Sequence, residues 1–314
     1  MTRHNDRRTF IKQGFIKQGA LGVAALTLKP GRLLGEDKAP VSLVQIQGPG
    51  VPRDLNEALR RLLEPMGGMK AFVRPGQNVL VKPNLAFPNV PEVRANTNPQ
   101  VVAAVVRAVI AAGGKVTVAD YSTEDPDEVR ERSGLAQALK GLDVKLLLPE
   151  DEDQFLEVLV LRGKDLKRTA VLKAALKAQV HIAVPIAKSH SSAGFTGVLK
   201  GNMGLIWSRK PFHFWHNLHK AIAELNSVPK LRPHLSIMDG LAVMVSGGPR
   251  GPGEVLTRNT LIAGTDPVAV DACGVRLAPL FGKRMRPRQV KHLALAEDMG
   301  LGRSDQKALE LSFL

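Results

Sequence analysis

Lysine, histidine and glycine residues are concentrated in the segment 186–205, which reads IAKSHSSAGFTGVLKGNMGL. Its polar side chains include Lys188, His190, Thr196, Lys200 and Asn202. Glycines let the backbone approach a ligand closely, while lysines and exposed backbone N–H groups attract anions. Imidazole exchanges protons near neutral pH, so His190 is a candidate general acid or base. The glycine order matches neither a Walker phosphate loop nor a G-x-G-x-x-G loop, so the class of anion stays open.

Other polar side chains follow predicted strands at the point where each strand ends. They are Lys82 with Asn84, then Asp120, and later Asp239. In an open α/β sheet, ligands bind outside the carboxyl ends of the strands. Turns are polar in any protein, so the alternative for each residue alone is an ordinary turn. Together they predict one site, in which the catalytic candidates are His190, Lys188 and Asp239, and the ligand-binding candidates are Lys82, Asn84, Thr196, Lys200, Asn202 and Arg250.

A second cluster contains three histidines, His213, His216 and His219, at intervals of three residues. On a helix they would share one arc, and with His190 they are candidate ligands for a divalent transition metal such as Zn, Fe or Ni. The alternative is one core histidine and one surface histidine close together by chance. The cluster has no carboxylate at a spacing that would strengthen the metal interpretation.

Three further residues have local explanations. Arg250 lies in the Gly/Pro-rich run 246–253, where it could bind a carboxylate or phosphate or simply belong to a turn. Cys273 is the single cysteine, so this chain can form no internal disulfide and can hold no iron–sulfur cluster alone. Asp271 follows a predicted helix start and is better explained as a surface or supporting group than as a catalyst.

Composition favours anionic partners. The formal charge is +15, of which residues 1–38 supply eight Lys and Arg against three Asp and Glu. The remainder is still strongly basic, which suits phosphates, carboxylates or an anionic surface, or is an ordinary solvated surface. Aromatic residues make up only 4% of the chain, which argues against nucleic acid, because single strands need aromatic stacking platforms.

The first 38 residues resemble an export signal. Arg7 and Arg8 precede Thr9, Phe10, Ile11 and Lys12, as in a twin-arginine signal, and the weakly apolar run 19–28 is too short to span a bilayer. The duplicated FIKQG motif moves the arginines away from the apolar run, and cleavage or retention of the signal stays open. A basic amphipathic start without targeting value is the alternative. We expect export by the twin-arginine translocation machinery to a periplasmic or envelope-associated location.

The rest of the chain alternates strands with helices. Expected strands include 41–47, 77–82, 115–119, 144–148, 158–161, 179–186, 235–238 and 256–263, and expected helices include 55–63, 100–112, 127–140, 166–177, 217–225, 265–280 and 288–299. This alternation predicts an α/β fold with a largely parallel, doubly wound sheet and helices on both faces. We expect one domain over 39–314, or two lobes with a mobile loop over 188–216, and an irregular connection over 188–211.

Several motifs, in this order, resemble the domain of unknown function 362 family. They are VLVKPNL (79–85), NTNPQVVAAVV (96–106), GGKVTVAD (113–120), KSHSSAGFTGVLKGNMG (188–204), IMDG (237–240), GGPRG (247–251) and GTDPVAVD (264–271). The resemblance implies an α/β domain of undefined activity and carries the K-x-H, T-G and K-x-N elements onto Lys188, His190, Thr196, Gly197, Lys200 and Asn202. Some members of that family hold iron–sulfur clusters through cysteine runs that this chain does not have.

Three functions follow as hypotheses. The first is an enzyme that binds an anionic small molecule, a carboxylate or a phosphate, in a Lys/His pocket, with optional metal assistance. The second is a non-catalytic metal- or anion-binding accessory protein that serves an exported redox system through a redox partner protein. The third is an envelope protein whose basic surface binds anionic polymers in a salt-dependent way.

Overall fold

The structure is a computed structural model that describes residues 42–46, 54–122, 124–209, 212, 216–305 and 310–313. The chain divides into two units, Met1–Ala39 and Pro40–Leu314, and the fold below is that of the second unit. The predicted export signal and His213 lie outside the described residues.

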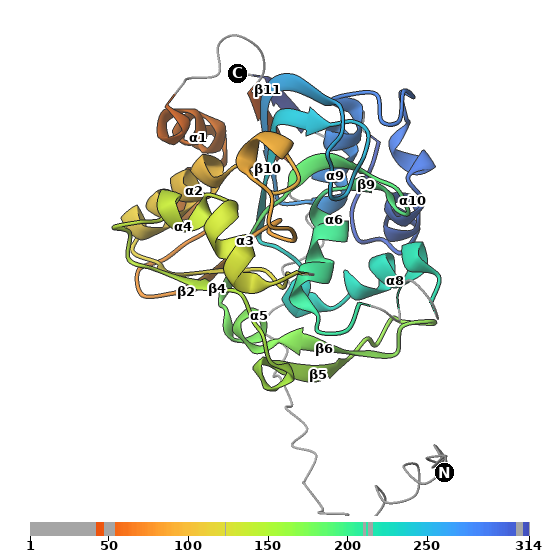
Figure 1. The fold of residues 1–314 in the computed structure, drawn as a ribbon, viewed down its shortest axis with the longest axis horizontal. Helices are drawn as coiled ribbons and strands as arrows, with labels where there is room; N and C mark the ends of the chain where they lie inside the picture. Colours follow the sequence, from red (N-terminus) through yellow and green to blue (C-terminus); the bar gives the residue numbers. More distant parts are fainter. Residues whose placement is uncertain are drawn as a thin grey trace, which may run out of the picture. The chain divides into compact units, whose positions relative to one another are not determined.

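One large mixed sheet of ten strands forms the centre of this unit (Figure 1). Its main path runs β12-β1-β11-β10-β7-β2-β3-β4, and β8 pairs with both β10 and β9. The strands are β1 (Ser42–Ile46), β2 (Asn78–Pro83), β3 (Lys115–Ala119), β4 (Val144–Leu147), β7 (Val180–Val184), β8 (Ile186–His190), β9 (Gly194–Thr196), β10 (Leu235–Met244), β11 (Val255–Gly264) and β12 (Glu310–Phe313). The run from β10 through β7, β2 and β3 to β4 is parallel, while β11 is antiparallel to both of its neighbours.

Helices cover both faces of the sheet. On one side lie α1 (Leu55–Leu63), α2 (Pro99–Ala111), α3 (Pro126–Arg132) and α4 (Leu135–Ala138), and on the other α5 (Lys173–Lys177), α6 (Val198–Gly201), α8 (Leu218–Leu225), α9 (Pro267–Arg276) and α10 (Lys291–Asp298) (Figure 1). The chain therefore has the predicted α/β fold, with a mostly parallel sheet and helices around it.

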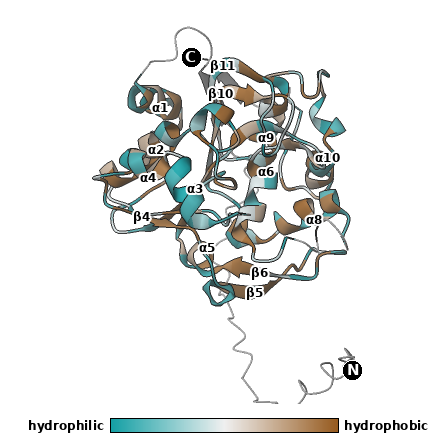
Figure 2. Cartoon of the chain, in the orientation of Figure 1, coloured by the Kyte–Doolittle hydropathy of each residue, from teal (hydrophilic) through white to brown (hydrophobic). Residues whose placement is uncertain are grey.

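Two apolar cores result from the alternation of side chains along the strands. Val79 and Val81 of β2 pack into the core beneath α1 and α2, whereas Leu80 packs into the core beneath α9. Ile182 and Ala183 of β7 divide between the same two cores. Figure 2 shows apolar strands through the middle of the unit and a hydrophilic α3 on its outside. A strand that is buried on both faces reads as a continuous apolar run, as parallel strands do.

Capping residues place several helices where the sequence predicts them. Asn98 accepts a hydrogen bond from the backbone N–H of Gln100 and begins α2, and Asp266 accepts from Val268 and begins α9. The helix predicted over 127–140 is instead two helices, because Gly134 between α3 and α4 has a left-handed φ of 73°.

Two predicted segments are wrong. The helix expected over 166–177 is the strand β6 (Arg168–Leu172) followed by α5, and β6 pairs with β5 (Phe155–Leu159) in a separate two-stranded sheet. The irregular connection expected over 188–211 contains β8, β9, α6 and the short 3₁₀ helix η5 (Asn202–Leu205).

Candidate functional site

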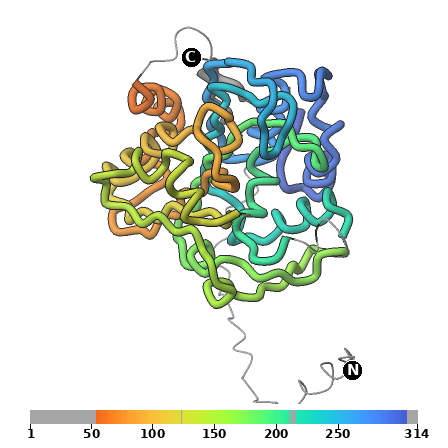
Figure 3. Tube along the Cα trace, viewed as in Figure 1, coloured from red at the N-terminus to blue at the C-terminus, as the bar shows by residue number. Residues whose placement is uncertain are grey.

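The larger of two cavities described here, of about 870 Å³, lies at the ends of β2 and β3 and along β8 and β9. This is the edge where ligands bind in open α/β sheets. The tube in Figure 3 shows the orange segment after β2 reaching the middle of the unit, beside the green segment that contains β8. The cavity-lining side chains used below are Asn84, Asp120, Tyr121, Lys188, His190, Thr196, Lys200, Trp207 and Arg209.

Lys188 is a buried ammonium group with three oxygen acceptors. Its Nζ donates to Asn84 Oδ1 at 3.2 Å, to Pro249 O at 2.8 Å and to Ala95 O, and it lies 5.1 Å from the centroid of the Phe87 ring. Burial, together with the charge of nearby Lys200, lowers the pKa of Lys188 to about 7. The three acceptors match the three donors of the protonated form. Lys188 therefore places an amine with three fixed acceptors in the cavity wall and ties three chain segments together.

His190 is held in one tautomer by its own turn. Its Nδ1 accepts hydrogen bonds from the backbone N–H groups of Ser192 and Ala193, both at 3.2 Å. Protonation of Nδ1 would break both bonds, so the neutral ring carries its proton on Nε2. In this tautomer Nδ1 is occupied by the turn and is not available as a general base, while Nε2 carries the proton.

A buried ion pair lies at the strand ends. Lys82 Nζ is 2.8 Å from Asp120 Oδ1 and also donates to Pro83 O at 2.8 Å. The second carboxylate oxygen accepts from the backbone N–H of Leu85 at 2.6 Å. Burial lowers the pKa of Lys82, and the adjacent carboxylate opposes that shift. Lys82 is not among the lining residues of the cavity, so its contact is with Asp120, and the ligand-binding role predicted for it is not supported.

Gly204 covers this ion pair closely. A Cβ at this position would lie 1.7 Å from Asp120 Oδ1 and 2.7 Å from Lys82 Nζ. The carbonyl of Gly204 also accepts from the backbone N–H of Tyr121 at 2.8 Å. The Gly-rich segment therefore has a glycine here because the backbone must pack directly on two charged side chains.

Lys200 and Thr196 present polar atoms to the cavity without protein partners. Within the described part of the chain, Lys200 Nζ makes no hydrogen bond or ion pair, and Thr196 Oγ1 is buried without a partner. Burial and the charges of Arg209 and Lys82 lower the pKa of Lys200 to about 7. An amine with this pKa gains or loses a proton readily near neutral pH.

Two residues that line the cavity, Tyr121 and Arg209, are absent from the sequence predictions. The Arg209 guanidinium lies 4.8 Å from the centroid of the Tyr121 ring and donates to the Tyr121 carbonyl. Tyr121 also stacks on Trp207 with ring centroids 5.1 Å apart. Two sequence features could have indicated them: Tyr121 directly follows Asp120, and Arg209 lies two residues after Trp207. Their spacing in sequence gave no indication that they meet.

Asp271 supports the cavity from behind. Its carboxylate accepts from the backbone N–H groups of Val198 at 2.6 Å and Leu199 at 3.0 Å, which begin α6. A Cβ on Gly197 would lie 2.1 Å from Asp271 Oδ1, so the glycine is required for this approach. Asp271 is fully buried, which corrects the expectation of a surface group but agrees with that of a supporting one.

Besides Lys82, three further predicted site residues do not line the cavity and have other contacts. Asp239, in β10, accepts hydrogen bonds from the backbone N–H groups of Asn98 and Leu241. Asn202 donates to Asn226 Oδ1 and Leu231 O. Arg250 forms an exposed ion pair with Glu124 at 2.8 Å. The strand predicted over 235–238 continues to Met244, so Asp239 lies within the strand and not at its end.

The histidine cluster is only partly described. His216 Nδ1 lies 3.2 Å from Asp165 Oδ1, and His219 stacks on His292 with ring centroids 5.9 Å apart. Among the described residues, no group of three or more His, Cys, Asp or Glu side chains is arranged to hold a metal ion. The structure thus does not bring His190, His216 and His219 together, and the metal site stays a prediction.

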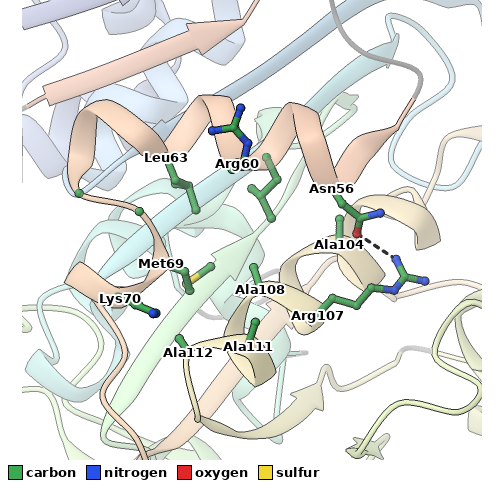
Figure 4. Close-up of a pocket in the computed structure, with 13 residues that line it drawn as sticks. Asn56, Arg60, Leu63, Met69, Lys70, Ala104, Arg107, Ala108, Ala111 and Ala112 are labelled. Atoms are coloured by element: carbon green, nitrogen blue, oxygen red, sulfur yellow. Dashed lines mark hydrogen bonds between the residues drawn. The ribbon is translucent and has the colours of Figure 1, made fainter.

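A second cavity of about 560 Å³ lies between α1 and α2. Leu63 and Met69 face alanines of α2 across it, and Arg107 donates to Asn56 Oδ1 at 3.3 Å near one end (Figure 4). None of the site residues predicted from the sequence lines this cavity.

The profile of the family described as "Domain of unknown function (DUF362)" matches residues 79–276. The chain belongs to this family. A thylakoid-associated protein of Synechocystis sp. (strain ATCC 27184 / PCC 6803 / Kazusa) is 31% identical over 272 residues, which cover 82% of this chain and 77% of that protein.

Two solved structures are similar at lower identity. The lactate racemase apoprotein from Thermoanaerobacterium thermosaccharolyticum is 11% identical, with a TM-score of 0.44 over 74% of this chain and 57% of that one. A Thermotoga maritima protein is 16% identical, also with a TM-score of 0.44, over 78% of this chain and 58% of that one. This chain therefore spans less than two thirds of the length of either solved protein.

Proposed function

We propose that the cavity binds an anionic small molecule that carries a carboxylate or phosphate group, and that the protein is an enzyme acting on it. The observation that carries this proposal is the charge of the lining. Lys188, Lys200 and Arg209 face one cavity, whose single described carboxylate, Asp120, is already paired with Lys82. Cations that share a buried cavity repel one another, and a bound anion relieves that repulsion.

The lining residues divide the chemistry among themselves. Lys188, held in place by its three acceptors, attracts and positions the anion. Lys200 is the proton-exchanging group, because its pKa of about 7 suits proton transfer at neutral pH and its amine is not held by such a set of acceptors among the described residues. His190 donates from Nε2 to a ligand oxygen on which negative charge develops, as a preorganised hydrogen-bond donor does. This division moves the acid–base role from His190, where the sequence suggested it, to Lys200.

Calorimetric titration of small anions into the full chain tests this proposal. The panel is inorganic phosphate, an alkyl phosphate, acetate and a dicarboxylate. Lys200→Met should weaken the tightest of them by about tenfold or more, because a charge-assisted hydrogen bond is lost. Lys145→Met removes an exposed lysine on β4 and should leave affinity unchanged. Equal weakening by both variants would mean that the general basic surface binds the anions.

A non-catalytic anion carrier is the second candidate. Lys188 and Asp120 have their hydrogen-bonding capacity taken up by protein partners, as expected of groups that position a ligand without reacting. The tightest ligand of the panel should be incubated with wild type and with His190→Ala and followed by NMR. An enzyme changes the ligand, and His190→Ala slows that change while binding persists. A carrier leaves the ligand unchanged in both.

We also propose that the protein is exported through the twin-arginine machinery and works at a membrane or envelope surface. The sequence of residues 1–38 supports export, and the printed name of the 31% identical relative, a thylakoid-associated protein, supports a membrane-associated location. No helix among the described residues is long and apolar enough to cross a membrane.

A further inference from the structure

We infer that the ligand is the dianion of a phosphate monoester, bound with its phosphate among Thr196, Lys200 and Arg209, and that a proton is taken up when it binds. This inference rests on the proposed anion site and narrows its ligand from any carboxylate or phosphate to one class.

The first support is a set of buried donors. Among the described residues, Thr196 Oγ1 and Arg209 Nε are buried without a hydrogen-bond partner. Thr196 is 2% exposed, and both residues line the cavity. A buried donor without an acceptor costs about 1–3 kcal/mol, so such groups are normally satisfied by a ligand or by water. The cavity has several donors, and its carboxylate, Asp120, is already paired with Lys82. A ligand with several acceptor oxygens would therefore satisfy these donors.

The second support is the amount of charge. Lys188, Lys200 and Arg209 remain after Lys82 and Asp120 have neutralised each other. A monocarboxylate supplies one negative charge, whereas a phosphate monoester carries between about 1.5 and 2 at pH 7. The doubly charged ligand therefore compensates more of the lining than a carboxylate or a sulfate ester of the same size.

The third support is the direction from which the donors come. Thr196 ends β9, Lys200 belongs to α6, and Arg209 follows η5, where its plane is fixed by the Tyr121 ring. Donors on three separate elements can approach a ligand from different directions. A phosphate group presents three terminal oxygens in different directions, whereas a carboxylate presents two in a plane.

Proton uptake follows from the placement of two amines, Lys188 and Lys200, in the lining of one cavity. Burial, together with the charges of neighbouring cations, lowers the pKa values of Lys188 and Lys200 to about 7, so above neutral pH these groups are only partly protonated. A dianion beside them favours the charged forms and raises both pKa values. Binding at pH 7.5 must then draw protons from the buffer.

Calorimetry with three anions that share a phenyl ring tests the inference. They are phenyl phosphate, phenyl sulfate and benzoate. Each is titrated at pH 7.5 in two buffers of different ionisation enthalpy, which gives the number of protons exchanged. Phenyl phosphate should bind at least about tenfold more tightly than the two monoanions and with net proton uptake. Phenyl sulfate is tetrahedral but singly charged, so it separates charge from shape.

Thr196→Val supplies the matched variant. It should weaken phenyl phosphate by about tenfold without lowering the free energy of unfolding, because Thr196 Oγ1 has no hydrogen-bond partner to lose among the residues that the structure describes. Thr117→Val, on β3 outside the cavity lining, should leave affinity unchanged.

Benzoate or phenyl sulfate binding as tightly as phenyl phosphate, binding without proton uptake, or full affinity in Thr196→Val would overturn this inference and leave anion binding in place. Failure of all three probes to bind would overturn the proposed anion site as well.

Discussion

Asp120 and Lys82 show at the scale of single residues how the cavity can hold several cations. The carboxylate pairs with one lysine, accepts from the backbone of Leu85 and lines the cavity with its remaining surface. Each of the two charges is buried, so each depends on the other to offset the loss of hydration. The pair thus belongs to the structure of the site, while Lys200 and Arg209 remain for a ligand.

Removal of one member of this pair should be costly. Asp120→Asn leaves Lys82 buried without a counter-ion and should lower the free energy of unfolding by about 3–5 kcal/mol in urea titrations. The double variant Asp120→Asn with Lys82→Met should recover much of that loss, because the unpaired charge is gone. A single variant as stable as the wild type would show that water reaches Lys82 and that the pair is not buried in solution.

Residue types predicted part of the site. Lys188, His190, Thr196 and Lys200 line the cavity as expected, because a polar segment directly after a buried strand has to lie at the sheet edge. Arg209 was missed because its place depends on the Tyr121 ring, which is 88 residues earlier in the chain. No local pattern encodes a contact of that length.

At the scale of elements, α6 is positioned by a single carboxylate. Asp271 of α9 accepts from the first two backbone N–H groups of α6, and Lys200 is the next residue of that helix. Displacement of α6 would move Lys200 relative to Lys188. The position of the proton-exchanging group therefore depends on a residue that does not itself contact the cavity.

Asp271 makes the stability of the fold depend on pH. Burial raises its pKa to about 7 from the 3.8 of a free carboxyl group, against the opposing effect of its two backbone donors. Between these values the folded chain binds more protons than the unfolded chain, so the free energy of unfolding falls as pH rises from about 4 to 7. Asp271→Asn removes this titration, and its free energy of unfolding should change less over the same range. Parallel curves for the two proteins would exclude Asp271 as the source.

Capping residues in the sequence predicted where helices begin. Asn98 and Asp266 mark helix starts in the sequence and cap α2 and α9 in the structure. The strand β6 was missed because the apolar residues of 166–177 also fit helical spacing, and only pairing with β5 makes the first half extended. The strand β8 was missed because its sequence includes the polar residues Lys188 and His190, which are buried and line the cavity.

At the scale of the whole molecule, a strongly basic chain concentrates positive charge in one cavity at the sheet edge. The overall charge of +15 could be predicted to favour anions, but not where an anion would bind. The sheet topology determines the location of the cavity, because parallel strands bring β2, β3 and β8 to one edge.

Export is a property of the whole chain that can be tested independently. Residues 1–38 fused to a folded reporter should direct it out of the cytoplasm, and Arg7→Lys with Arg8→Lys should abolish that export. Arg3→Lys, outside the arginine pair, is the matched control and should export normally. Unchanged export after replacement of both arginines would contradict the twin-arginine assignment and leave the cavity proposal untouched.

The most direct test of an anion site in the large cavity is a crystal of the full chain soaked in tungstate, with the oxyanion located by its anomalous scattering. The account predicts a peak in the cavity within hydrogen-bond distance of Lys200 Nζ and the Arg209 guanidinium, and loss of that peak in Lys200→Met. Tungstate bound elsewhere on the basic surface while the cavity stays empty would contradict the central claim.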